Sequence, residues 1–331
     1  MSVAAAAFAA LIAAALIPLT RPMLLRIALA KPNARSSHKI PTPQGGGVAV
    51  IAATLLAAGV AIAFAGNAVV TIPLLVFAAS VFIAVIGFVD DVRPLPVAPR
   101  LLLQASAVAA VLFAIPGELK IVPASPLWLE RGLLLIAGLW FVNLVNFMDG
   151  LDLMTAAEAV PIAAVIALIG FVGLIPADTA IVAAALGGAL IGFVPFNRPV
   201  AKIFLGDVGS LPIGLLLGWG LLELAMQGQI AAALLLPLYY LADATLTLFR
   251  RIARREAFWA AHRSHFYQRA TDNGFTVWRV VGEVFALNVG LALLALASVR
   301  LQTMWADLVL LAIGAAAVGF QLHRFAQPRV A

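Results

Sequence analysis

Long apolar runs recur throughout this chain, and they exclude a soluble fold. Of its 331 residues, 64% are hydrophobic and 11% are charged, whereas soluble domains carry about 25% charged residues. Each run is roughly long enough to cross a hydrocarbon core of about 30 Å as a helix, although the fourth, 101–115, is short. A helix also satisfies its own backbone hydrogen bonds, which lipid requires. The sequence therefore predicts an all-α, polytopic transmembrane helical bundle that forms a single domain over residues 1–331.

Eleven membrane spans are predicted from these runs. Their limits are 3–20, 46–65, 70–89, 101–115, 132–148, 155–175, 179–195, 210–226, 229–248, 280–299 and 304–321. With the N-terminus outside, all but three of the 21 Lys and Arg residues fall in inner loops, which is where cytoplasmic loops collect them. We therefore expect the N-terminus outside and the C-terminus in the cytoplasm. No cysteine is present, which excludes disulfides and thiol chemistry.

Polar residues interrupt the end of the fifth span. Asn143, Asn146 and Asp149 are spaced three residues apart, which predicts a slanted stripe on one helix face. Gly150 then permits a turn, and Asp152 follows it. Polar groups at a membrane are costly unless they bind something. Capping a helix end, the structural alternative, needs one such residue rather than four, so this segment indicates a binding or catalytic site.

Two acidic motifs lie at other span ends. Asp90 and Asp91 are adjacent, which suits a general base or Mg²⁺, an ion that takes oxygen ligands. A solvated loop start neutralised by Arg93 is the alternative. Asp207 precedes the eighth span and is placed for the same metal ion, with a capped helix start as the alternative. We expect Ser210 to be the N-cap of that helix, whose free N–H groups would then face a phosphate.

The longest inner loop, 249–279, is rich in Arg and aromatic residues, which suits a helix lying at the membrane surface. His262 and His265 in this loop would bind a diphosphate or transfer protons near neutral pH. A purely basic membrane anchor explains the arginines but not the two histidines. Every polar cluster thus falls on the predicted cytoplasmic side. We expect the active site to be formed by the loops 21–45, 90–100, 149–154, 196–209 and 249–279.

Six motifs occur in a fixed order along the chain. They are Pro32-Asn-x-Arg35-Ser-x-His38 with Pro41-Thr-Pro43; Asp90-Asp91; Arg100-Leu-Leu-Leu-Gln104; Asn143-x-x-Asn146-x-x-Asp149-Gly150-x-Asp152; Phe204-Leu-Gly-Asp207-x-Gly-Ser210; and Ala261-His262-Arg-Ser-His265. In this set the chain resembles the polyprenyl-phosphate N-acetylhexosamine-1-phosphate transferase superfamily of bacterial membranes. The segments around Arg100 and His262 are more similar to the branch that starts O-antigen or related polysaccharide synthesis than to the peptidoglycan branch.

The resemblance implies a reaction at the cytoplasmic face of the bacterial inner membrane. A UDP-linked N-acetylated sugar would donate sugar-1-phosphate to undecaprenyl phosphate and release UMP, with Mg²⁺ as cofactor and Mn²⁺ as the alternative ion. Membrane lipid is the other implied partner, nucleic acid is not expected, and a homodimer is left open. The runner-up function is a transporter with intramembrane carboxylates. It predicts polar residues at broken helices near mid-span, whereas these lie at span ends.

The resemblance also implies roles for individual residues. The catalytic residues would be Asp90, Asp91, Asp149, His262 and His265. The metal ion would be held by Asp207 and Asp91. The substrates would be bound by Lys39, Arg100, Asn143, Asn146, Asp152 and Arg263. One departure concerns the turn after the fifth span, because Leu153 stands where the family usually has a glycine.

Overall fold

Among the described residues, ten helices are long and apolar enough to cross a membrane. The computed structural model describes residues 1–30, 40–66, 71–257 and 262–328. The ten helices are α1 Ser2–Ile27, α2 Gly47–Phe64, α3 Thr71–Val92, α4 Val97–Ala114, α5 Leu127–Phe147, α6 Met154–Phe171, α7 Ala177–Asn197, α8 Asp207–Met226, α12 Val277–Leu301 and α13 Met304–Ala326. The shorter elements are α9 Ile230–Leu235, α10 Leu238–Ala253, α11 Phe266–Asp272, β1 Leu29–Ala30 and β2 Thr42–Pro43. The prediction of a polytopic helical bundle is confirmed.

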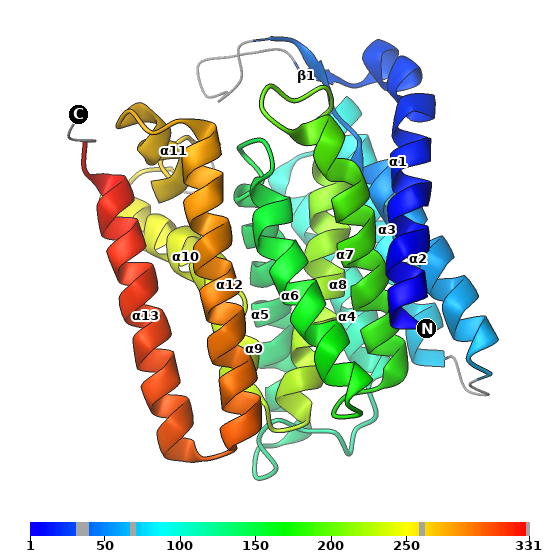
Figure 1. Cartoon of the computed structure of the whole chain (residues 1–331), viewed down its shortest axis with the longest axis vertical. Helices are drawn as coiled ribbons and strands as arrows, with labels where there is room; N and C mark the ends of the chain where they lie inside the picture. The colour runs from blue at the N-terminus through cyan, green and yellow to red at the C-terminus, as the bar shows by residue number, and fades with distance from the viewer. Residues whose placement is uncertain (31–39, 67–70, 258–261, 329–331) are drawn as a thin grey trace.

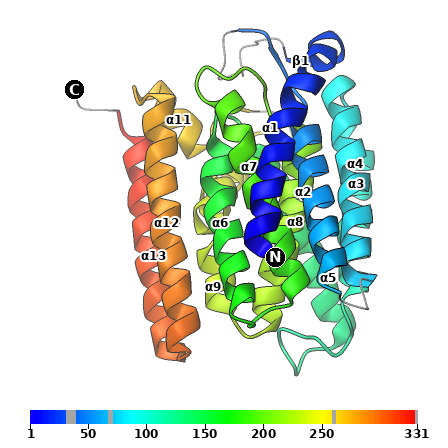
Figure 2. The ribbon, with the colours of Figure 1, turned by 45° about the vertical axis from the view of Figure 1, so that its right-hand side comes forward.

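The helix α8 lies at the centre of the bundle. In the most apolar stretch of 18 residues in this helix, 83% of the residues are buried inside the protein. The corresponding share is 22% in α1 and in α13. Figure 2 shows α12 and α13 side by side along one edge, away from α1. A helix that is apolar all round suits such an interior position. Asp207, the first residue of α8, is therefore carried by the most enclosed of these helices.

The predicted span 229–248 is not a single helix. Its two parts, α9 and α10, are separated at Pro237, which has no backbone N–H to continue the hydrogen-bond ladder. The helix α10 also carries Asp243, Arg250 and Arg251, so it is less apolar than the other spans. The prediction of one continuous span is wrong here.

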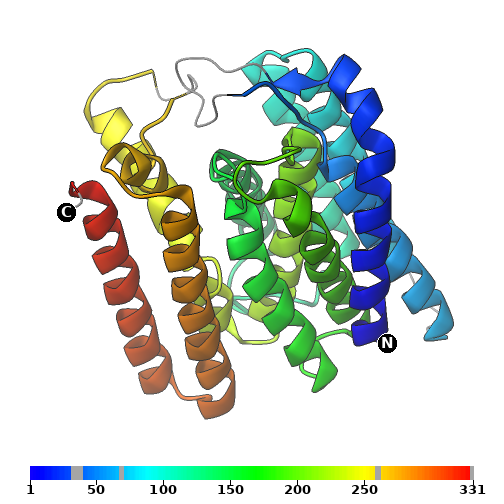
Figure 3. The ribbon, with the colours of Figure 1, turned by 45° about the horizontal axis from the view of Figure 1, so that its top comes forward.

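Several connections that carry polar motifs lie at one end of the bundle. Figures 1 and 3 show β1, the α7–α8 connection and α11 at that end. The strands β1 and β2 pair antiparallel, with Leu29 opposite Pro43. Beyond β2, the backbone N–H groups of Gly46 and Gly47 donate to the carbonyls of Phe204 and Leu205 at 2.9 and 2.8 Å. These bonds fix the segment that immediately precedes α8.

Candidate active site

Asp91 of α3 caps the N-terminus of α8. Its two carboxylate oxygens accept the backbone N–H groups of Asp207 and Val208 at 3.0 and 3.1 Å. Gly206, just before the helix, has a φ of 77°, a conformation that favours glycine. A Cβ at Gly206 would also lie only 2.5 Å from Oδ2 of Asp91. The Asp90-Asp91 motif and the Asp207 motif are thus joined directly.

This cap replaces the one that we predicted. The helix begins at Asp207, and the hydroxyl of Ser210 accepts a hydrogen bond from Asn146 at 2.9 Å instead of capping the helix. The first four N–H groups of α8 are taken by the Asp91 carboxylate and by the carbonyl of Gly206. The prediction that these N–H groups are free to bind a phosphate is therefore wrong, because the Asp91 carboxylate stands where the phosphate was expected.

The amides at the end of α5 reach two neighbouring helices. Asn143 donates to Oε1 of Gln104 in α4 at 2.8 Å. Asn146 donates to Oδ1 of Asp207 at 2.7 Å, which links α5 to the start of α8. Asp149 lies beyond the end of α5. The predicted helical stripe therefore holds for Asn143 and Asn146, which reach different neighbours, but it does not extend to Asp149.

Asp90 pairs with Arg100 of α4. Its Oδ2 lies 2.7 Å from Nη1 of Arg100, and its Oδ1 accepts the backbone N–H of Leu95 at 2.6 Å. The adjacent carboxylates thus have different partners, because Asp90 holds a cation and Asp91 caps a helix. The carboxylate of Asp207 interacts electrostatically with both. Three acidic side chains are therefore gathered around the start of α8.

The α5–α6 connection carries Asp149 and Asp152. Thr155 donates to Asp149, and Asp152 accepts the backbone N–H of Ala201 at 3.0 Å. Burial, together with the nearby charges of Asp91 and Asp152, raises the pKa of Asp149 to about 7. A carboxyl group with this pKa is available in both protonation states near neutral pH, as acid–base catalysis requires.

Leu153 makes the turn that glycine would make readily. Its φ is 65°, in the left-handed region, and its N–H donates to Oδ1 of Asn197 at 2.7 Å. Its side chain is buried in the core. Burial and the hydrogen bond offset the backbone strain, so the turn after Asp152 is kept without glycine.

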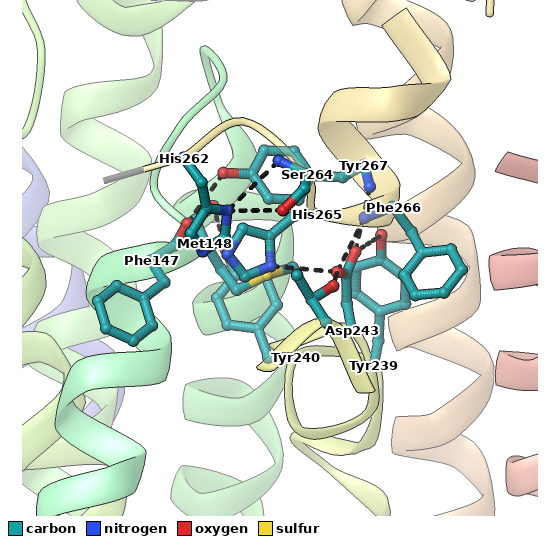
Figure 4. A network of polar contacts seen from close by, with 11 residues as sticks. Phe147, Met148, Tyr239, Tyr240, Asp243, His262, Ser264, His265, Phe266 and Tyr267 are labelled. Atoms are coloured by element: carbon teal, nitrogen blue, oxygen red, sulfur yellow. Dashed lines mark hydrogen bonds and ion pairs between the residues drawn. The ribbon is translucent and has the colours of Figure 1, made fainter. Parts of the chain in front are cut away.

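His262 and His265 stack on each other beside the α5–α6 connection (Figure 4), with ring centroids 4.8 Å apart. Nδ1 of His262 lies 2.9 Å from the hydroxyl of Ser264. Both histidines precede α11, so they do not lie on the surface helix that we expected for this loop. Their stacking nevertheless brings two imidazole rings to one place.

Asp243 of α10 is a residue that the sequence analysis missed. Its carboxylate is fully buried and accepts the backbone N–H groups of Phe266 and Tyr267 at 3.0 and 3.1 Å. It also contacts Nδ1 of His265 (Figure 4). The available signal was an acidic residue inside the predicted span 229–248, because such residues are costly in lipid.

Two cavities meet at Asn146 and Asp207, which line both. The first, which we call the polar cavity, has a volume of about 590 Å³ and is also lined by Asp91, Asp149 and Asp152.

The second cavity, which we call the apolar groove, has a volume of about 580 Å³. Arg100, His262 and His265 form part of its lining, and most of the remaining wall is apolar, made by Val97, Leu101, Ile136, Leu139, Trp140 and Leu248. Ile136 is 68% exposed, so the groove reaches the outer surface of the bundle.

The acidic groups around the start of α8 suit a divalent cation. Asp91 and Asp207, which both carry carboxylates, line the polar cavity. Mg²⁺ is commonly held by one or two carboxylates together with substrate phosphates and water. Among the residues that the structure describes, no three His, Asp or Glu side chains form a ready-made metal cage, and this mode of binding needs none. The residues therefore fit Mg²⁺ that is shared with a phosphate ligand.

One of the predicted substrate-binding residues is not brought to these cavities, and another lies outside the part of the chain that the structure describes. Arg263 pairs with Asp272 and donates to Thr271 at 2.9 Å, and it is not among the lining residues of the polar cavity or the apolar groove. Lys39 lies outside the described residues. Arg100, Asn143 and the remaining predicted site residues line one cavity or the other, except Asp90, which holds Arg100.

Several proteins of known name are similar to this chain over more than half of its length. Residues 73–225 match the model of glycosyl transferase family 4. A phospho-N-acetylmuramoyl-pentapeptide-transferase of Mycolicibacterium gilvum is 33% identical over 225 residues, which are 52% of this chain and 61% of that relative. Proteins of the same name from Mycobacterium avium and Mycobacterium tuberculosis are 30% identical over 275 residues, which are 68% of this chain and 76% of theirs.

Proposed function

Because the chain belongs to the polyprenyl-phosphate N-acetylhexosamine-1-phosphate transferase superfamily, we propose that it transfers a sugar-1-phosphate from a UDP-sugar to undecaprenyl phosphate and releases UMP. The observation that carries this proposal is the pair of cavities that meet at Asn146 and Asp207. One substrate is soluble, and the other has a long apolar tail. Their phosphates must therefore meet where a polar cavity joins a groove open to lipid.

The two cavities differ in the substrate that each suits. The apolar groove would bury isoprene units, at about 25 cal/mol for each Å² removed from water. Arg100, His262 and His265, which also line it, would pair with the lipid phosphate through charge-assisted hydrogen bonds. Asp90 holds the guanidinium of Arg100 at 2.7 Å and so positions it. The nucleotide sugar would occupy the polar cavity.

The transfer exchanges one bond to phosphorus for another. An oxygen of the lipid phosphate bonds to the sugar-bearing phosphorus, and the bond from that phosphorus to UMP breaks. Both reactants are anionic, so their charge must be neutralised. Mg²⁺ supplies this neutralisation when it is bound, and Asp207 and Asp91 would hold it. Asp149 would accept or donate a proton, and the two histidines would donate hydrogen bonds to phosphate oxygens.

The sugar is proposed to be an N-acetylated hexosamine, transferred in the first step of O-antigen or related polysaccharide synthesis. The motifs around Arg100 and His262 support this branch, whereas the relatives are named for phospho-N-acetylmuramoyl-pentapeptide transfer. Superfamily membership does not favour a transporter, the alternative function. The acidic residues are better accounted for by the transfer reaction, which takes place at the inner face of the membrane.

Purified protein in detergent with undecaprenyl phosphate, Mg²⁺ and a panel of UDP-sugars tests the proposal. We expect UMP release with a UDP-N-acetylhexosamine, none with UDP-glucose, and none when the lipid phosphate or the metal ion is left out. Release with UDP-N-acetylmuramoyl-pentapeptide alone would assign the chain to that reaction instead. An absence of UMP with every donor would reject the transfer.

Filling each cavity with a bulky side chain tests which substrate it binds. Leu101 lines the apolar groove, and Val277 lines the polar cavity. We expect Leu101→Trp to raise KM for undecaprenyl phosphate by about tenfold, or about 1.4 kcal/mol, with KM for the UDP-sugar unchanged. Val277→Trp, the matched variant, should show the reverse. The same pattern in both variants would contradict the assignment of the cavities.

A further inference from the structure

One ring nitrogen of His265 is held by a buried carboxylate. Nδ1 lies 3.3 Å from Oδ1 of Asp243, and both residues are buried. The ring lines the apolar groove, as Asp207 does. Nε2, on the opposite side of the ring, makes no hydrogen bond within the described part of the chain. It is therefore the nitrogen that is left for a ligand.

Five donors converge on the Asp243 carboxylate. They are the backbone N–H groups of Phe266 and Tyr267 at 3.0 and 3.1 Å, the hydroxyls of Tyr239 and Thr247 at 3.3 Å each, and Nδ1 of His265. A carboxylate that is fully removed from water needs such partners. Surrounded by donors, it acts only as an acceptor, so Nδ1 must carry a hydrogen in this contact.

We propose that Asp243 is a positioning residue, which holds His265 with Nδ1 protonated and directs Nε2 at the substrate phosphates. This inference rests on the proposed function, because the phosphates are those of the transfer reaction. Asp243 lines neither cavity, so it acts through the histidine. Its bonds to Phe266 and Tyr267 hold the backbone next to that histidine (Figure 4). The Asp243 carboxylate thus orients both the imidazole ring of His265 and the backbone that follows it.

The rings beside His265 limit its freedom further. Its ring stacks on His262 with centroids 4.8 Å apart and on Tyr267 with centroids 5.8 Å apart. These contacts restrict the tilt of the imidazole but do not choose between its two tautomers. That choice depends on the carboxylate, because a hydrogen bond at one ring nitrogen sets the state of the other.

Asp243→Asn separates this role from simple packing. Asparagine keeps the size of the side chain but presents N–H groups on one side, so it no longer accepts from every donor. We expect kcat to fall by about 10- to 100-fold, with KM for the UDP-sugar nearly unchanged. If Asp243 acts through His265, the double variant with His265→Gln should be no slower than His265→Gln alone. Losses that multiply in the double variant would overturn the proposal.

Two control variants remove other donors from the same carboxylate. Tyr239→Phe and Thr247→Val each delete one hydroxyl and leave the contact between Asp243 and His265 in place. We expect both to keep kcat close to that of the unmodified protein. A loss in both as large as that of Asp243→Asn would assign the carboxylate a purely structural role.

A spectroscopic measurement tests the tautomer without turnover. The chain has 4 histidines, so ¹⁵N-histidine labelling gives few signals, and His265→Gln identifies the signal of interest. We expect a protonated Nδ1 in the unmodified protein and loss of this state in Asp243→Asn. An unprotonated Nδ1 in the unmodified protein would overturn the inference. A protonated Nδ1 in a protein that transfers no sugar-phosphate would refute the proposed reaction but retain Asp243 as the group that orients His265.

Discussion

Replacing Asp207 by asparagine is expected to reduce turnover by at least about 10²-fold, the scale of losing one key electrostatic contact. Asp207 lines both cavities, and Asn146 already donates to its Oδ1 at 2.7 Å. Asparagine keeps the size of the side chain but removes the negative charge that we propose to hold Mg²⁺. Turnover is measured as UMP released at saturating concentrations of both substrates.

Asp91→Asn should also reduce turnover by at least about 10²-fold, but for a different reason. The carboxylate of Asp91 accepts two backbone N–H groups, at 3.0 and 3.1 Å, with its two oxygens. Asparagine has one oxygen and would place an NH₂ group against the other donor. The start of α8, which carries Asp207, would then move, so this variant should also unfold at a lower temperature than Asp207→Asn.

Glu118→Gln is the matched control for these two variants. It makes the same kind of chemical change, from carboxylate to amide, at an exposed position in the α4–α5 connection. We expect its turnover to equal that of the unmodified protein. Near-normal rates in both Asp91→Asn and Asp207→Asn would refute the roles that we assign to these carboxylates.

Most membrane helices could be predicted from the sequence because their apolar runs are long and nearly uninterrupted. The exception is the segment 229–248, where Pro237 separates α9 from α10. The pattern of apolar residues alone could not reveal this break, since proline is tolerated in membrane helices when neighbours satisfy the backbone. Proline does not break every helix here, because α1 continues through Pro18 and Pro22.

That the acidic motifs lie close together could be predicted from the sequence, but less completely than the membrane helices. Span ends that share one side of a membrane lie near one another, so Asp91, Asn146 and Asp207 were expected together. Their pairing was not predictable, because it joins residues that are far apart in the chain. The carboxylate of Asp91, for example, caps a helix that begins 116 residues later. A local N-cap at Ser210 was the better prediction from sequence, and this long-range contact overrides it.

Close contacts between backbones were also invisible in the sequence. Gly87 of α3 lies one turn before Asp91, on the same face of the helix. A Cβ at Gly87 would lie 2.4 Å from the carbonyl carbon and oxygen of Asp207 and 2.6 Å from the backbone nitrogen of Val208. Glycine therefore allows α3 to touch the first residues of α8. Nothing in the sequence marks Gly87 for this role, because it stands in an ordinary apolar run.

Gly87→Ala is expected to reduce turnover by about 10²-fold although no charged group is changed. The atoms that the new methyl group meets belong to the backbone, so no side-chain rotation relieves the contact, and α3 must move away from α8. A displacement of about 1 Å is enough for such a loss when catalytic groups must be aligned. It would also lengthen the hydrogen bonds from Asp207 and Val208 to Asp91, which are 3.0 and 3.1 Å.

Gly290→Ala is the matched control for this variant. Gly290 also lies inside a membrane helix, α12, but a Cβ there would meet nothing within 4 Å. Alanine favours the helix over glycine by about 1 kcal/mol, so we expect unchanged turnover and an equal or higher unfolding temperature. Both variants are compared in detergent by UMP release and by thermal unfolding. If Gly87→Ala kept the turnover of Gly290→Ala, the contact between α3 and α8 would not be what aligns Asp91 with Asp207, and the cap on α8 would lose its proposed importance for catalysis.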